Sequence, residues 1–247
     1  MGISTFYSFN IPRPRVNKFR INPVKPANYN FKRIPIVFSS YTEASQPDTI
    51  SDTTPVQNIY NVEFKTLEGC KLGIWRYPIF EYNAKGGIGN GIGIGIGREK
   101  NDIIDVDFDV DDLYIPPLNG ETTKFLGLPL PPFLKIDIVP QILQGNINPA
   151  SGKVHLVLKS RFGFSVGSIY QAPPLLVETV LTSEESVGTI RSGIGERMNE
   201  KGRCKLVGVA VVDPITDAFM NNFLRLPTEC IAYLNAVITF SIAKPNS

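Results

Sequence analysis

The sequence predicts a mainly β protein, an antiparallel β-barrel or sandwich of about nine strands with one short C-terminal helix. Most segments beyond residue 55 alternate apolar and polar residues with a period of two, which is typical of strands that bury one face. Only one segment has helical spacing. The strand candidates are residues 58–66, 71–77, 103–110, 134–139, 154–166, 175–181, 188–198, 203–212 and 231–242.

Two turns predict which neighbouring strands pair. The turn Glu68-Gly69 predicts a hairpin of residues 58–66 with 71–77. Residues 199–202 form a second hairpin turn, whose register places Glu196 opposite Lys205. On the other face the same register pairs Arg197 with Cys204, Gly195 with Leu206, Gly193 with Gly208 and Arg191 with Ala210.

The one helical segment is residues 216–226. It places Phe219, Met220, Phe223 and Leu224 on one stripe, a spacing typical of a helix packed on a core. Thr216 or Asp217 can cap its start, and Pro227 ends it. We therefore expect a short packed helix just before the last strand.

Charge is distributed unevenly along the 247 residues. The first 42 residues contain seven basic side chains and no acidic one, and the first carboxylate is Glu43. The whole chain has 25 basic and 23 acidic residues, so the remainder has a net charge of −5. Nucleic-acid binding requires clustered basic residues, and this acidic remainder does not favour it.

The basic, acid-free segment 1–43 is typical of an organelle transit peptide. Its prolines interrupt any long amphipathic helix, which favours a chloroplast (plastid) address over a mitochondrial one, the runner-up. A disordered basic tail is the third interpretation. Residues 44–55 have the composition of a disordered linker, and residues 56–244 are expected to form a single β-rich domain.

Several classes of site find little support in the sequence. No apolar run is long enough for a transmembrane segment. One histidine, His155, and three scattered cysteines, Cys70, Cys204 and Cys230, do not suggest a metal site, and no nucleophile motif is present. No cofactor motif was found either, so we predict none.

Two repetitive segments have both a structural and a functional interpretation. The glycines of residues 86–97 lack the spacing of a dinucleotide or phosphate loop. The segment is either a strand with one bare face, open to a backbone or a flat ligand, or a low-complexity insertion. Asp105, Asp107, Asp109 and Asp111 share one strand face, for which we favour solvation over metal binding, with Lys159 and Arg161 on a facing strand.

Two candidate sites follow from the predicted strands. Arg191 and Arg197 would flank a floor formed by Gly193 and Gly195, where two guanidinium groups can hold a carboxylate or phosphate. Two solvent-facing arginines are the simpler interpretation. Glu178 lies in the apolar run 175–181, and burial would raise its pKa, as a catalytic proton donor requires.

Three functions remain open. The first is a plastid β-rich protein, soluble or membrane-peripheral, that binds an apolar small molecule (lipid, isoprenoid or pigment) or lies on a thylakoid or envelope surface. The second is a cofactor-independent isomerase or cyclase that uses a carboxylic acid in an apolar pocket. The third is a non-catalytic scaffold or assembly factor. A large apolar interior would favour the first two over the third.

Overall fold

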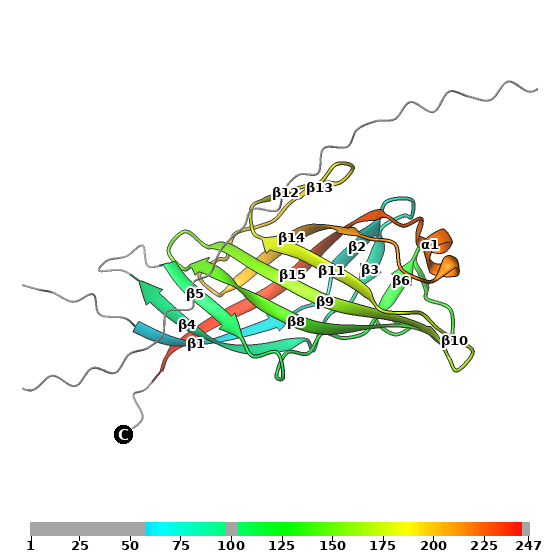
Figure 1. The fold of residues 1–247 in the computed structure, drawn as a ribbon. Helices are drawn as coiled ribbons and strands as arrows, with labels where there is room; N and C mark the ends of the chain where they lie inside the picture. The colour runs from blue at the N-terminus through cyan, green and yellow to red at the C-terminus, as the bar shows by residue number, and fades with distance from the viewer. Residues whose placement is uncertain (1–57, 97–102, 244–247) are drawn as a thin grey trace, which may run out of the picture. The chain divides into compact units, whose positions relative to one another are not determined.

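The structure, a computed structural model, describes residues 58–96 and 103–243, which form an antiparallel β-barrel (Figure 1). Eight strands close the barrel, because the last pairs with the first. This confirms the mainly β prediction and decides between barrel and sandwich. In spatial order the eight are β1 (Asn58–Thr66), β4 (Ile88–Ile96), β5 (Ile103–Phe108), β8 (Leu134–Asn148), β9 (Lys153–Val166), β11 (Leu175–Thr182), β14 (Arg203–Val212) and β15 (Thr228–Ile242).

Shorter strands extend this barrel, so the total exceeds nine. Four continue the sheet from β15, namely β2 (Cys70–Ile74), β3 (Phe80–Tyr82), β6 (Thr123–Phe125) and β7 (Leu128–Pro129). The short β10 (Tyr170–Gln171) pairs with β9. A separate two-stranded hairpin, at the top of Figure 1, consists of β12 (Glu185–Val187) and β13 (Ser192–Ile194).

The predicted first hairpin is wrong. β1 and β2 do not pair with each other but follow one another along β15, with Thr66 opposite Ala236 and Lys71 opposite Tyr233. Gly69, at a φ of 76°, lies in the short connection between them. The turn residue therefore lies in a short break between two strands that run in the same direction along β15, and it does not mark a chain reversal.

The strand from Leu134 is longer than its alternation predicts. The sequence prediction ends it before Pro140, because proline lacks a ladder donor. A register shift between Pro140 and Ile142 accommodates the proline, and β8 continues to Asn148. This bulge also changes the parity of the inward face, from Ile138 to Leu143.

The glycine-rich segment is strand β4, so its interpretation as a strand is confirmed. Its bare face is inside the barrel, since Gly91 lies opposite the buried Val62 and Gly93 opposite Tyr60. A Cβ at Gly91 would approach the Asp107 carbonyl oxygen to 2.5 Å. Protein atoms therefore occupy the bare face, while Ile92 and Ile94 are exposed outside.

The aspartate face is solvated but lacks the predicted basic partner. β5 lies between β4 and β8, with Asp105 opposite Asn146 and Asp107 opposite Gln144. Lys159 and Arg161 belong to β9, which lies on the far side of β8. The pairing with a basic strand is therefore wrong, because parity alone does not specify the neighbouring strand.

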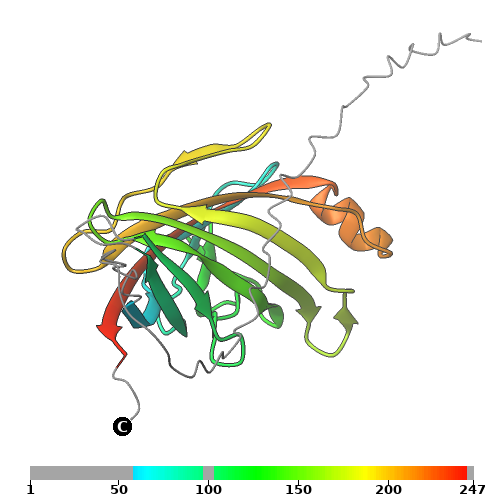
Figure 2. The ribbon, with the colours of Figure 1, turned by 60° about the vertical axis from the view of Figure 1, so that its left-hand side comes forward.

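The short helix α1 (Ala218–Leu224) covers one end of the barrel (Figure 2). Asp217 is its N-cap and accepts the backbone N–H of Met220 at 2.7 Å, as predicted. Met220 is fully buried against Phe164 and Val212 at that end. Among the described residues, no helix has the length and apolar character needed to span a bilayer.

Candidate functional site

The barrel interior has two halves that differ in solvent access. Away from α1, most inward-facing side chains are buried and form one close-packed cluster. We call this the filled half. It contains Val62, Phe64, Val106, Phe108, Leu143, Ile147, Leu156, Leu206 and Ile238.

Next to α1, several inward-facing apolar side chains remain partly exposed, although others, such as Phe164 and Leu175, are buried. They belong to two clusters that share Leu134 and Ile136, so they surround one region. We call this the open half. Its partly exposed inward residues are Leu72, Phe80, Phe125, Ile136, Ile138, Phe162, Val177, Cys230, Ala232 and Leu234. Partly exposed apolar side chains on the inward face of a barrel make this end a candidate site for an apolar molecule.

A chain of aromatic contacts surrounds the open half. Phe80 stacks on Phe125 at 4.7 Å between ring centroids, and both contact Tyr77. The hydroxyl of Tyr77 donates to the carbonyl oxygen of Phe223 in α1 at 2.6 Å. Phe223 in turn stacks on Phe219. These contacts join the β2–β3 loop to α1 and fix the helix at the barrel end.

The barrel wall has a weak seam beside the open half. β11 and β14 share one ladder pair, Thr182 with Val207, whereas β14 shares ten pairs with β15. Toward α1 the two strands separate (Figure 2). Two hydroxyls replace the missing ladder around Val209. Thr179 donates to its carbonyl oxygen at 2.8 Å, and the Ser186 hydroxyl accepts its N–H at 3.1 Å.

Two buried hydroxyls point into the barrel without a partner. Ser160 on β9 is 0% exposed and Thr228 on β15 is 4% exposed, and neither hydroxyl oxygen has a hydrogen-bond partner among the described residues. Both belong to the inward faces of their strands. Burial also raises the pKa of the Cys230 thiol to about 11. Apart from Cys230, the partly exposed inward side chains named for the open half are hydrocarbon.

Glu178 lies outside the barrel. Its side chain is 62% exposed, and a carboxylate oxygen lies 3.7 Å from the Lys159 ammonium on the neighbouring strand. Val177 and Thr179, on either side of it, face inward. The burial on which its predicted catalytic role depends is therefore absent.

Arg191 and Arg197 do not lie together over a glycine floor. The predicted register holds at Glu196, which pairs with Lys205 through backbone and side chain, but not beyond it. Residues 192–194 leave β14 and pair with β12. Arg197 donates to both carboxylate oxygens of Glu184, at 2.6 and 3.0 Å, and this lowers the pKa of Glu184. Arg191 donates to the Ile74 carbonyl oxygen at 2.9 Å.

The two glycines of that predicted floor serve close packing. A Cβ at Gly193 would lie 2.5 Å from the Tyr233 hydroxyl, and one at Gly195 would lie 2.6 Å from the Lys205 carbonyl oxygen. Their bare faces are thus against the barrel wall. Arg197 does line an outer groove with Lys85, Arg203 and Lys205, of which Lys205 is paired with Glu196.

Sequence reasoning missed the residue that holds the β12–β13 hairpin on the barrel. Glu229 on β15 is 4% exposed, and its carboxylate accepts the backbone N–H groups of Thr189, Ile190 and Arg191. Three donors around one carboxylate compensate for its burial. Nothing in the local sequence signals this contact, because the partners are about 40 residues apart.

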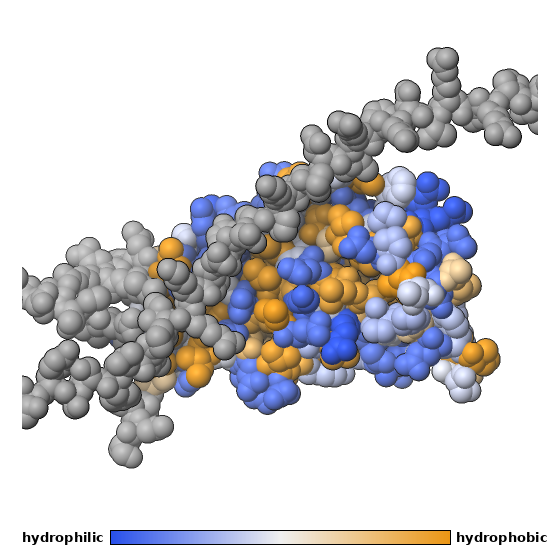
Figure 3. Space-filling view, viewed as in Figure 1, coloured by the Kyte–Doolittle hydropathy of each residue, from blue (hydrophilic) through white to orange (hydrophobic). Residues whose placement is uncertain are grey.

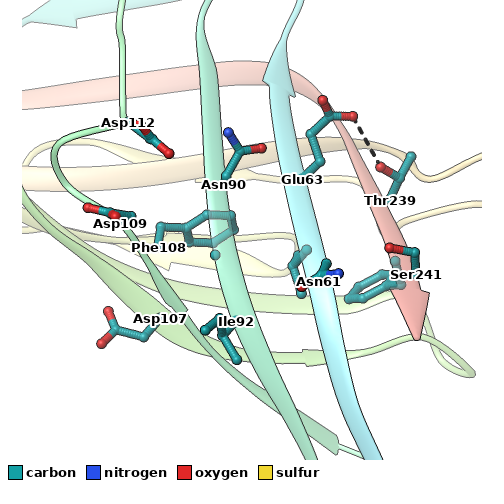
Figure 4. Close-up of a pocket in the computed structure, with 13 residues that line it drawn as sticks. Asn61, Glu63, Asn90, Ile92, Asp107, Phe108, Asp109, Asp112, Thr239 and Ser241 are labelled. Atoms are coloured by element: carbon teal, nitrogen blue, oxygen red, sulfur yellow. Dashed lines mark hydrogen bonds between the residues drawn. The ribbon is translucent and has the colours of Figure 1, made fainter. Parts of the chain in front are cut away.

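A second groove lies on the outer face of β1, β4, β5 and β15 (Figure 4). Its polar walls include Glu63, Asn90, Asp107, Asp109 and Asp112. Glu63 is already paired with Lys65 at 2.8 Å. Among residues 58–96 and 103–243, no group of three or more His, Cys, Asp or Glu is arranged to hold a metal ion.

The described part of the chain is therefore a β-barrel protein whose inward-facing side chains are mostly buried at one end and in part exposed at the other. Comparisons with protein-family models, with curated proteins and with solved structures found no match to this chain.

Proposed function

We propose that this protein binds an apolar small molecule, such as a lipid, isoprenoid or pigment, in the open half of its barrel. The observation that supports this most is the contrast between the two halves. Residues such as Leu156 and Ile238 are buried in one, while apolar residues on the same strands, such as Phe162 and Leu234, are partly exposed in the other. Accessible apolar surface raises the free energy of the empty protein, and an apolar ligand would lower it.

A blocking variant tests this proposal in the full chain. Ala232 is inward and partly exposed, so Ala232→Phe places a ring in the open half. Val211→Phe, on the exposed outer face of β14, is the matched control. We expect Ala232→Phe to weaken displacement of a neutral fluorescent apolar probe at least about tenfold, with an unchanged circular dichroism spectrum. Equal binding by both variants, or no binding by the wild type, contradicts the proposal.

The seam between β11 and β14 suggests a path for the ligand. Neighbouring strands that share one ladder pair separate at a lower free-energy cost than strands with a full ladder. The hydroxyl contacts of Thr179 and Ser186 close this edge without a continuous ladder. We therefore place entry and exit of the ligand at this edge.

A second candidate function, attachment to a membrane surface, is favoured by the loops at the α1 end. Phe133 is 80% exposed and Ile169 is 90% exposed, and the N–H of Gly167 donates to the Phe133 carbonyl oxygen at 2.9 Å, so the two turns are adjacent. Hydrophobic atoms protrude at the lower right of Figure 3, where the β9–β10 turn lies in Figure 1. Exposed Leu126 and Leu128 belong to the β6–β7 hairpin, and exposed Phe219 belongs to α1. Apolar side chains held on turns can insert into the lipid interface.

Vesicle binding tests this attachment with a control that also replaces two exposed apolar residues. The double variant Phe133→Ser, Ile169→Ser removes two exposed apolar side chains from turns at the α1 end. The control, Val187→Ser with Ile194→Ser, removes two exposed residues from the β12–β13 hairpin. We expect only the first pair to reduce co-sedimentation with vesicles of neutral galactolipid and phosphatidylglycerol. Equal sedimentation of both double variants and the wild type would overturn this candidate.

The cyclase and scaffold alternatives receive less support. A cyclase of the expected kind needs a carboxylic acid in the apolar site, and Glu178 lies outside. A scaffold needs no accessible interior.

The plastid address is part of this proposal, and expression of residues 1–55 fused to a fluorescent protein tests it. Retention of the fusion in the cytosol would contradict it.

A further inference from the structure

We infer that the ligand of the open half contains a neutral oxygen group, a hydroxyl or carbonyl, that hydrogen-bonds to Ser160 at the inner end of the site. This inference rests on the proposed function. It adds the chemical class of the ligand and its orientation, with the polar group innermost.

Ser160 lies where the two halves of the interior meet. Along the inward face of β9, Leu156 and Leu158 precede it and belong to the filled core, while the partly exposed Phe162 follows it. Its ladder partners are Pro140 on β8 and Val177 on β11. Ser160 is therefore the first fully buried inward residue of β9 beyond the partly exposed Phe162, and we place the polar end of the ligand there.

The Ser160 hydroxyl has hydrogen-bonding capacity that the barrel does not use. The residue is 0% exposed and its oxygen has no partner among the described residues. The facing residue Pro140 has no backbone N–H to offer. A buried hydroxyl that lacks a partner destabilises a protein, so a site that retains one is favourable for a ligand that satisfies it.

The surrounding residues select a neutral group. The inward residues of the open half have no charged side chain, so a carboxylate or phosphate at this depth would lack a counter-charge. A hydroxyl both donates and accepts, so Ser160 can bind an alcohol, a ketone, an aldehyde or an ester carbonyl. The ligand class is an apolar chain or ring system with an uncharged oxygen group at one end.

Ligands of one chain length test this directly. Dodecane, dodecanol, dodecanone and dodecanoate compete with a neutral fluorescent apolar probe on the full-length protein at neutral pH. Dodecanol and dodecanone should bind about fivefold to tenfold more tightly than dodecane, which is the effect of one net hydrogen bond. Dodecanoate should bind more weakly than dodecanol.

Ser160→Ala should remove the advantage of dodecanol and dodecanone while leaving dodecane unchanged. Ser192→Ala, on the exposed face of the outer hairpin, is the matched control and should retain the advantage. Ser160→Cys keeps the volume of the side chain and only a weak donor, so it should lose most of the advantage and serves as a second variant.

The outcomes separate the two proposals. If dodecane and the oxygenated ligands all fail to displace the probe, the proposed function fails. If dodecane binds but dodecanol has no advantage, or keeps it in Ser160→Ala and Ser160→Cys, only the inference about Ser160 is overturned.

Discussion

The hydroxyl of Thr179 on β11 donates to the carbonyl oxygen of Val209 on β14 at 2.8 Å, across two neighbouring strands that share a single ladder pair. The Ser186 hydroxyl accepts the N–H of the same residue. Side chains thus provide the hydrogen bonds at Val209 that a backbone ladder provides elsewhere in the barrel. The wall beside the open half is therefore continuous but weakly joined.

Replacement of Thr179 by valine should loosen this seam. Valine has nearly the same shape but cannot donate, so the variant should lose about 1 kcal/mol of unfolding free energy. Hydrogen exchange should accelerate at residues 208–212, and exchange of a bound apolar probe should be faster. Thr239→Val, at an exposed site on β15, is the control. Unchanged exchange in Thr179→Val would show that the seam is not held by this contact.

Replacement of Glu229 by glutamine should release the β12–β13 hairpin. The amide group would turn a donor toward backbone N–H groups that need an acceptor, at a cost of about 1–3 kcal/mol. Hydrogen exchange of residues 185–194 should rise strongly, with less change in β8 and β9. Glu200→Gln, in the exposed 199–202 turn, provides the comparison. Identical exchange profiles for the two variants would contradict the role of Glu229.

Alkylation of Cys230 should report on the open half. Its pKa is raised to about 11, and the thiolate is the reactive form. The rate of reaction with iodoacetamide should therefore rise about tenfold for each pH unit between pH 7 and 10, beyond the range where a free thiol levels off. A bound apolar ligand should slow it. Peptide mass spectrometry measures this, with the buried Cys70 and Cys204 as slow internal references.

A levelling of the Cys230 rate near pH 8.5 would mean that the thiol is solvated and does not face the apolar interior. A rate that an apolar ligand leaves unchanged would place ligand binding elsewhere on the protein.

A methyl group at Gly91 should destabilise the barrel. Its Cβ would lie 2.5 Å from the Asp107 carbonyl oxygen and 3.0 Å from the Phe108 ring, which belongs to the filled half. We expect Gly91→Ala to cost about 1–3 kcal/mol, measured by urea unfolding. Ile92→Ala, one residue on and 59% exposed, should cost less than about 0.5 kcal/mol. A larger loss for Ile92→Ala than for Gly91→Ala would mean that the glycine face of β4 lies outside the barrel.

Truncation of Met220 should weaken the closure of the barrel by α1. The side chain is 0% exposed, so Met220→Ala should cost about 2–5 kcal/mol in urea unfolding. The neighbouring Phe219 is 56% exposed, and Phe219→Ala should cost less despite its larger side chain. Similar losses for both would contradict the burial pattern of the helix.

Local patterns in the sequence determined most of the secondary structure. Alternation along residues 154–166 predicted β9 and the burial of Leu156 and Leu158, because successive side chains of a strand face opposite sides. The cap at Asp217 and the ion pair of Glu196 with Lys205 were predictable for the same reason, since their partners are within ten residues. The plastid localisation of the protein stays a prediction from its first 43 residues, which lie outside the described structure.

Tertiary structure alone decided which strands are neighbours and which polar groups have partners. Period-two alternation is the same for any partner strand, so it did not reveal that β1 and β2 both pair with β15, or that β13 leaves β14. Glu229 and Ser160 are alike in sequence terms, each a polar residue in a strand. Packing of the β12–β13 hairpin on β15 gives Glu229 three donors, whereas Ser160 faces inward and has no partner among the described residues.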